Sequence, residues 1–284
     1  MELQHHTAQV NGVRLHYVEA GSGPLVVLLH GFPEFWFSWR GQIEALAQAG
    51  FRVVAPDQRG YAQSDRPPSW RDYRVERLAD DVADLVHALG EERAHVVGHD
   101  WGAVVAWWVA TRRPEVVDRL AILNVPHPAR MLEGLRTPRQ LAKSWYIFFF
   151  QIPWLPEWLM RRGGRRTLES AYRDARPGAF TAEDYARYEE ALLGPGGLRG
   201  PINWYRAALR RSPRATRALL APIPAPVLVI WGEQDRFLIK EMADPDPQFV
   251  PDVRVVRLPA ASHWVQHDEP DRVNALLIDF LSAA

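Results

Sequence analysis

One acidic residue of the sequence stands where a covalent nucleophile would be expected. Asp100 lies between Gly98 and Gly102, after the apolar run 94–97 and before an apolar, helix-like segment over 104–111. This order predicts a nucleophile elbow, a sharp strand-to-helix turn that lifts one side chain above a sheet, although an Asp between glycines can also simply form a turn. A carboxylate, with an ordinary pKa of about 3.9, needs no base to act as a nucleophile. Its attack on saturated carbon gives an ester, whereas its attack on an ester gives a reactive anhydride, which argues against an ordinary esterase.

An ester on Asp100 must be hydrolysed, and this step needs a base and an acid that orients the base. In proteins with this elbow the chain order is nucleophile, acid, histidine. Asp235 and His263 each follow an apolar segment that reads as a buried strand, so both are expected at strand ends. Glu233 is the nearest alternative to Asp235, and His267 competes with His263. The favoured interpretation is a set of Asp100, Asp235 and His263.

The segment His30-Gly31-Phe32-Pro33 ends another apolar strand, over 25–29. Its simplest interpretation is a tight turn with a cis bond before Pro33. Its functional interpretation is an oxyanion hole made by the backbone N–H groups of Phe32 and Trp101. These donors would hold the carbonyl oxygen of Asp100 while water attacks the ester.

The whole chain resembles the α/β-hydrolase-fold epoxide hydrolases. The motifs that carry the resemblance are His30-Gly31-Phe32-Pro33-Glu34, Gly98-His99-Asp100-Trp101-Gly102, Gly232-Glu233-Gln234-Asp235 and Ser262-His263-Trp264. In that family two cap tyrosines donate to the epoxide oxygen, and the segments around Tyr146 and Tyr205 are similar to the two cap motifs. Tyrosine hydroxyls, with an ordinary pKa of about 10, stay protonated at neutral pH and can donate to a departing alkoxide. A departing halide needs no proton.

The elements that must position these residues follow from the pattern of the sequence. Apolar strands alternate with helix-like segments up to about residue 128 and again after 213, which predicts a mostly parallel sheet. Between these parts the alternation stops, and one of the helix-like segments opens with Thr181 and Asp184 as a capping box. With the resemblance, we expect an α/β-hydrolase fold whose mostly parallel eight-stranded sheet is flanked by helices. Residues 1–128 and 214–284 would form its core, and 129–213 an inserted helical cap.

Aromatic residues near these motifs suggest an apolar substrate pocket. We assign His30, Pro33, Trp36 and Phe150 to it, while the aromatic side chains could also serve only to join cap and core. The run of arginines at 161, 162, 165 and 166 is interpreted as a solvated helix face.

The composition limits the partners. The 284 residues include 34 Lys and Arg against 34 Asp and Glu, and this balance gives no reason to expect nucleic acid or an anionic membrane. The absence of cysteine excludes disulfides and thiolate metal sites. No apolar run approaches the ~20 residues that span a bilayer, and no signal-peptide pattern opens the chain, so we expect a cytoplasmic protein without a membrane span.

The leading hypothesis is therefore an epoxide hydrolase that forms a vicinal diol through an ester on Asp100. We expect a small epoxide and water as partners, no metal and no cofactor, and either a monomer or a homodimer. A haloalkane or haloacid dehalogenase with the same nucleophile is the alternative, and a catalytically inactive binding protein is a third interpretation.

Overall fold

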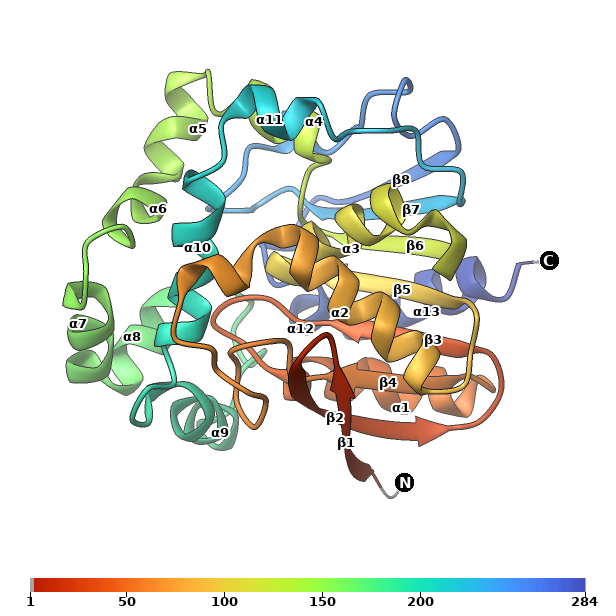
Figure 1. The fold of residues 1–284 in the computed structure, drawn as a ribbon, viewed down its shortest axis with the longest axis horizontal. Coiled ribbons are helices and arrows are strands. Elements are labelled where there is room, and N and C mark those ends of the chain that lie inside the picture. Colours follow the sequence, from red (N-terminus) through yellow and green to blue (C-terminus); the bar gives the residue numbers. More distant parts are fainter. Residues whose placement is uncertain (1–2, 284) are drawn as a thin grey trace.

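The computed structural model describes residues 3–283 as one twisted eight-stranded sheet with helices on both faces (Figure 1). The strand order is β1-β2-β4-β3-β5-β6-β7-β8. Strands β1 and β2 pair antiparallel, as do β2 and β4, and all other neighbours are parallel. The strands are β1 (Gln4–Val10), β2 (Val13–Gly21), β3 (Leu25–Leu29), β4 (Arg52–Pro56), β5 (Ala94–His99), β6 (Val117–Leu123), β7 (Val227–Gly232) and β8 (Val253–Leu258). The predicted mostly parallel eight-stranded sheet flanked by helices is confirmed.

Helices cover the sheet because its central strands are apolar on both faces. All five residues of β3 are at most 3% exposed, as expected of a parallel strand between two helical layers. In Figure 1, α2 (Val75–Ala88) and α3 (Trp101–Arg112) pack together in front of the sheet. Behind it, α1 (Arg40–Gln48) packs against α13 (Pro270–Leu281). The short helix α12 (Val265–Asp268) and the 3-10 helices η1 (Trp36–Trp39), η2 (Trp70–Tyr73), η3 (Pro114–Val116) and η4 (Lys240–Met242) complete the core.

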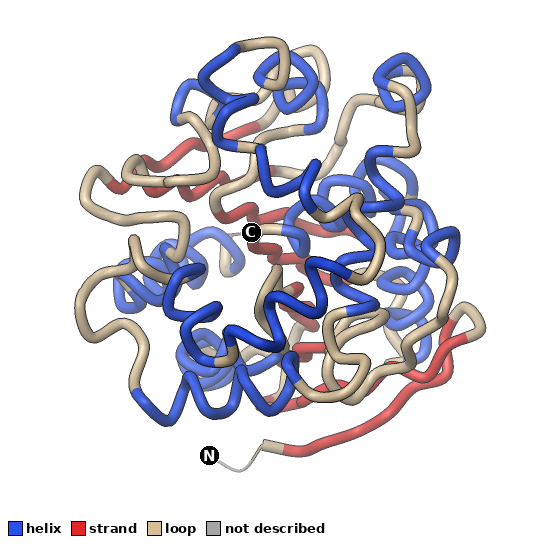
Figure 2. The backbone as a smooth tube through the Cα atoms, turned by 90° about the vertical axis from the view of Figure 1, so that its left-hand side faces the viewer, coloured by secondary structure: helices blue, strands red, loops and turns tan. Residues whose placement is uncertain are grey.

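A block of helices lies between β6 and β7 in the sequence, at the left and top of Figure 1 and turned to the viewer in Figure 2. Its members are α4 (Pro128–Gly134), α5 (Pro138–Lys143), α6 (Trp145–Phe149), α7 (Leu155–Gly163), α8 (Arg165–Ala171), α9 (Ala182–Leu193), α10 (Arg199–Leu209) and α11 (Pro213–Arg217). The capping box predicted for one of them is confirmed, because Thr181 and Asp184 exchange side-chain and backbone hydrogen bonds at the start of α9. The exact division of the chain into core and cap stays a prediction.

No helix among residues 3–283 is long and apolar enough to cross a membrane.

Candidate active site

Asp100 occupies the turn between β5 and α3 with a strained backbone. Its φ of 49° and ψ of −123° lie in a region that side chains other than glycine rarely adopt, so tight packing must hold the turn in place. Two glycines permit that packing. A Cβ atom on Gly31 would lie 2.3 Å from the Cβ of Asp100, and one on Gly102 would lie 1.9 Å from the carbonyl oxygen of Leu29. The fold therefore displays the Asp100 side chain at the end of a central strand.

The structure brings Asp100, Asp235 and His263 into one chain of contacts. They follow three different strands, β5, β7 and β8 respectively. Nε2 of His263 lies 3.5 Å from Oδ2 of Asp100, and Nδ1 lies 2.7 Å from Oδ2 of Asp235. Only Asp100 keeps notable solvent exposure, 18% of its side chain against 2% or less for the other two. The imidazole thus stands between a partly open carboxylate and a buried one.

Asp235 is fixed by four donors. Besides His263, the amide of Asn124 donates to Oδ2 at 2.8 Å, and the backbone N–H groups of Phe237 and Leu238 donate to Oδ1 at 2.6 and 2.9 Å. Burial opposes the charged form, but the charge of His263 and these hydrogen bonds together lower the pKa of Asp235. The carboxylate is therefore charged and cannot rotate freely, which fixes the orientation of the imidazole.

The electrostatic state of His263 is set by competing causes. Burial lowers the pKa of His263, but the charge of Asp235 and the hydrogen bonds and charge of Asp100 outweigh burial and hold that pKa well above its usual range. The two carboxylates favour the imidazolium form. Any event that removes the charge of Asp100 must therefore lower the pKa of His263.

The loop after β3 supplies a donor to the nucleophile. The backbone N–H of Phe32 donates to Oδ1 of Asp100 at 2.7 Å. The peptide bond between Phe32 and Pro33 is cis, as the turn interpretation predicted. Trp101 is the first residue of α3, and the first N–H groups of a helix have no carbonyl partner within it. The N–H of Phe32 thus already donates to Asp100, and the N–H groups at the start of α3 are further possible donors next to it.

Two tyrosines of the cap pack over this site. The rings of Tyr146 from α6 and Tyr205 from α10 lie 5.9 Å apart, and Tyr205 packs edge-on to Trp101 at 4.9 Å. Burial is the main cause that raises the pKa of both tyrosines, and the charge of Asp100 raises it further. Both hydroxyls therefore stay protonated and can donate hydrogen bonds.

Comparisons with known proteins decide the family. The family described as alpha/beta hydrolase fold matches residues 24–270. The AB hydrolase superfamily protein YfhM of Bacillus subtilis is 44% identical over 275 residues, 95% of each chain. Epoxide hydrolase 2 of Caenorhabditis elegans is 40% identical over 286 residues, 98% of this chain and 80% of the relative. The chain belongs to the α/β-hydrolase-fold epoxide hydrolases.

Solved structures agree with this assignment. A mutant epoxide hydrolase from Bacillus megaterium, complexed with its product (R)-3-[1]naphthyloxy-propane-1,2-diol, superimposes with a TM-score of 0.88 at 33% identity. The match covers 98% of this chain and all of the other. An epoxide hydrolase from an endophytic Streptomyces gives a TM-score of 0.85 at 32% identity, over 98% of this chain and 95% of that one.

The residues assigned to the substrate pocket of this epoxide hydrolase lie in different surroundings. The ring of Phe150 packs against Phe32 at 5.6 Å and against Tyr205 at 4.8 Å, beside the nucleophile. Pro33 lies in the loop after β3, and its carbonyl oxygen accepts a hydrogen bond from Tyr172 at 2.8 Å. These contacts place Phe150 between Phe32 and Tyr205 and give Pro33 a link to the cap.

His30 and Trp36 are held by the scaffold. Both ring nitrogens of His30 are engaged, Nδ1 with the carbonyl of Gly31 and Nε2 with the backbone N–H of Gln58. The ring of Trp36 packs edge-on to His5 of β1 at 5.5 Å, and its other ring contacts are with the adjacent Phe35 and Phe37. Contact of either side chain with substrate stays a prediction.

The two rival residues have partners of their own. Glu233 faces Arg257 at 3.5 Å and Lys240 at 3.9 Å. Nε2 of His267 lies 2.8 Å from Oε1 of Glu34. Neither is directed at the triad, so the arrangement favours Asp235 and His263.

Two positioning residues lacked a sequence signal of their own. Asn124 directly follows β6 with a φ of 49°, accepts the backbone N–H of Gly232 at 2.7 Å and donates to Asp235. Glu34 is fully buried, and Nδ1 of His99 lies 3.0 Å from its Oε2. The other nitrogen of His99 lies 2.9 Å from the carbonyl oxygen of His263, so Glu34 and His99 anchor the backbone of the base. Glu34 and His99 belong to the motifs that carry the family resemblance and Asn124 does not, but for all three only tertiary contacts reveal what they hold.

Among residues 3–283, no group of three or more His, Cys, Asp or Glu side chains is arranged to hold a metal ion.

Proposed function

We propose that this epoxide hydrolase converts a small epoxide to a vicinal diol through a covalent ester on Asp100. The observation that carries the proposal is the continuous contact from Asp100 through His263 to Asp235, faced by two protonated tyrosines. A carboxylate nucleophile, a base and two acids are the groups that a two-step hydrolysis of an epoxide needs.

The first step is an attack by Asp100 on a ring carbon. Oδ1 accepts the N–H of Phe32, so Oδ2, which lies 3.5 Å from Nε2 of His263, is the nucleophilic atom. Its bond to carbon forms as the carbon–oxygen bond of the ring breaks. Tyr146 and Tyr205 donate to the departing oxygen and supply the proton, which solvent then replaces. A departing alkoxide needs such donors, whereas a halide does not.

The second step is hydrolysis of the ester. His263 takes a proton from water, and the resulting hydroxide attacks Cγ of Asp100. Negative charge develops on the carbonyl oxygen of the ester, where the N–H groups of Phe32 and Trp101 stabilise it. The diol oxygen then leaves with the proton from His263. When Asp100 ionises again, its proton returns His263 to the imidazolium form. The proton that His263 released after alkylation balances the one that the tyrosines took from solvent.

The first step prepares the base for the second. An ester carries no charge, so alkylation removes one of the two carboxylates that raise the pKa of His263. The pKa of His263 falls, and the neutral imidazole that can accept a proton becomes more populated. Reaction at Asp100 thus switches the imidazole from ion-pair partner to general base.

We further propose that aryl-substituted epoxides are among the substrates. The rings of Phe32, Phe150, Tyr146 and Tyr205 contact one another around the nucleophile. The solved relative that holds a naphthyloxy diol is consistent with this class.

Trapping the ester tests the mechanism. The variant His263→Gln should accumulate a protein adduct of the mass of the epoxide, because it can be alkylated but cannot activate water. Mass spectrometry of the intact protein, with Asp100→Ala as the control that forms no adduct, measures it. In labelled water, a single turnover of the unaltered enzyme should place one heavy oxygen in the peptide that contains Asp100. Absence of both adduct and label would rule out the ester, and halide release from haloalkanes without diol formation would favour the dehalogenase.

A further inference from the structure

Large apolar side chains are exposed on one stretch of the cap. Nine are exposed within residues 3–283, and six of the nine lie between positions 145 and 166, from α6 to the start of α8. These six are Trp145, Phe148, Ile152, Trp154, Trp158 and Leu159, with exposures of 42–72%. Isolated exposed apolar residues are ordinary, but a concentration of this kind indicates a surface that binds something. We call residues 145–166 the outer cap face.

The outer cap face is also basic. It contains Arg161, Arg162, Arg165 and Arg166 but only one carboxylate. That carboxylate, Glu157, is neutralised by Arg206 of α10 at 2.7 Å. Arg165 pairs with Glu169, just outside the face, and the guanidinium of Arg162 lies over Trp158. Arg161 and Arg166 have no ion pair within residues 3–283. Positive charge is therefore concentrated here, although the chain as a whole is neutral.

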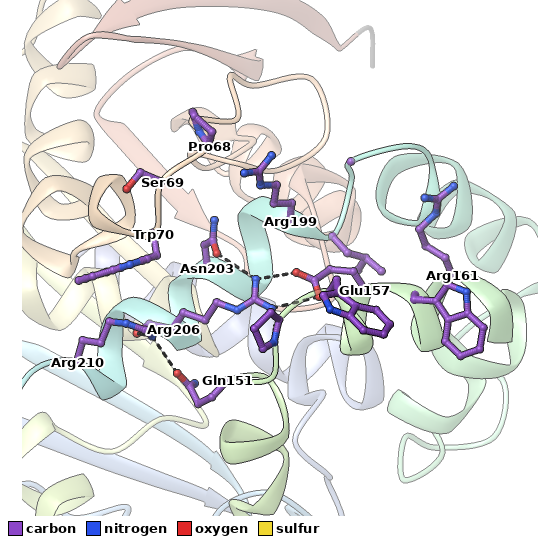
Figure 3. Close-up of a pocket in the computed structure, with 15 residues that line it drawn as sticks. Pro68, Ser69, Trp70, Gln151, Glu157, Arg161, Arg199, Asn203, Arg206 and Arg210 are labelled. Atoms are coloured by element: carbon purple, nitrogen blue, oxygen red, sulfur yellow. Dashed lines mark hydrogen bonds and ion pairs between the residues drawn. The ribbon is translucent and has the colours of Figure 1, made fainter.

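A hollow of about 640 Å³ opens between α7, α10 and η2, at one side of the outer cap face (Figure 3). Trp154, Trp158, Arg161 and Arg199 are among the residues that line it. The five N–H groups of Arg206 are all used, on Glu157, Asn203 and two backbone carbonyls. Arg199, by contrast, has no ion pair within the described chain. Arg210 also lines the hollow, and one of its nitrogens donates to Gln151 and to a backbone carbonyl. The guanidiniums of Arg161 and Arg199 thus have no ion pair or hydrogen bond within residues 3–283 and are available for an anion.

We propose that the outer cap face docks peripherally on the surface of a lipid bilayer that contains anionic phospholipids. Exposed Trp and Phe suit the boundary between headgroups and acyl chains, and arginines beside them suit anionic headgroups. A second copy of this chain fits less well, because a symmetric contact through this face would oppose the same uncompensated arginines. The hollow offers space and two free guanidiniums for a phosphate-bearing headgroup.

Docking would place the substrate-handling part of the cap at the membrane. Helix α6 carries Tyr146 toward Tyr205 on its inner side, while Trp145 is 63% exposed on the other. Apolar epoxides dissolve in bilayers, so a docked enzyme would meet them at raised concentration, a consequence that rests on the proposed function. The binding itself does not depend on turnover and can be measured separately.

Sedimentation with vesicles tests the proposal. The enzyme should bind vesicles of phosphatidylglycerol and phosphatidylcholine in equal parts more tightly than vesicles of phosphatidylcholine alone, and raised salt should weaken binding. The double variant Arg161→Glu with Arg166→Glu should bind the anionic vesicles at least about tenfold more weakly, because each basic group near such a surface contributes ~1 kcal/mol. Trp154→Ser with Trp158→Ser should also weaken binding.

Two variants serve as matched controls. Arg272→Glu lies on α13, on the opposite side of the molecule in Figure 1, and Leu219→Ser removes an exposed apolar residue outside the face. Both should bind as the unaltered enzyme does, and every variant should keep its turnover of a water-soluble epoxide. The proposal is overturned if anionic vesicles do not bind, or if the outer-face variants bind like the controls. It is also overturned if analytical ultracentrifugation without lipid shows a dimer that Trp154→Ser with Trp158→Ser dissociates.

Discussion

The core side and the cap side of the active site hold their side chains by different interactions. On the core side, Asp235 accepts four hydrogen bonds and His263 lies between two carboxylates, so nearly every polar atom has a directed partner. On the cap side, Tyr146 and Tyr205 are placed by ring contacts with Phe150, Phe237 and Trp101. Ring packing fixes position less sharply than charge-assisted hydrogen bonds do. We infer that the core provides precision, while the cap provides an apolar enclosure with two hydroxyls.

The largest expected effect is loss of the core nucleophile. Asp100→Ala should lower kcat by about 10⁴-fold or more, because the cap tyrosines alone provide no covalent route. Steady-state diol formation measures it, and circular dichroism should show an unchanged fold. Residual turnover within tenfold of the unaltered enzyme would mean that the cap can activate water directly.

The cap side should tolerate single losses better. Tyr146→Phe or Tyr205→Phe should each lower the rate of alkylation by about 10- to 100-fold, and the double variant by about 10³-fold, within the range for oxyanion donors. Rapid-mixing measurement of Asp100 alkylation separates this step from ester hydrolysis. If one single variant is as slow as the double variant, the two hydroxyls do not contribute separately to stabilising the departing oxygen.

The support of Asp235 should matter less than the triad itself. Asn124→Gly keeps the backbone free to adopt its positive φ but removes the amide that holds the carboxylate. We expect kcat to fall about tenfold, in the lower part of the range for lost partners that orient an active group. A carboxylate at position 124 cannot donate a hydrogen bond. If Asn124→Asp turns over as fast as the unaltered enzyme, the amide donor is not needed.

The smallest expected effect is a lower pKa of His263 when Asp100 loses its charge. Because the charge of Asp100 helps to raise the pKa of His263, Asp100→Asn should lower that pKa. The neutral base then appears at a lower pH, so the imidazole resonances should titrate earlier in an NMR series. An unchanged titration would show that Asp235 alone sets the state of the base.

Much of the core could be read from the order of the chain. Carboxyl ends of parallel strands meet at one edge of a sheet, so Asp100, Asp235 and His263, each just after an apolar strand, were expected to converge. Strand β1 was the exception among the strands, because Gln4–Val10 lies at the sheet edge, is largely exposed and shows no apolar alternation. An edge strand of this kind is fixed by its pairing with β2 rather than by its own pattern.

The surface is where the composition of the sequence says least. Equal numbers of acidic and basic residues gave no reason to expect an anionic membrane, yet the outer cap face collects arginines and exposed aromatic side chains. Net charge is a sum over the chain, so it does not show whether the positive and negative residues are separated on the surface. The arginines at 161, 162, 165 and 166 are exposed, as the interpretation of a solvated face predicted. The sequence did not show that Trp154 and Trp158 are exposed beside them.

By itself, the sequence determined the reacting groups, their order and the family resemblance, because residue types and strand-end spacing are local properties. Only the tertiary structure decided which neighbours those groups have. It turned Glu233 toward Arg257 and His267 toward Glu34, and it made Asn124 a support of Asp235. The reason is physical: a strand determines where a loop begins, but the direction of a side chain in that loop depends on partners that the fold brings from elsewhere.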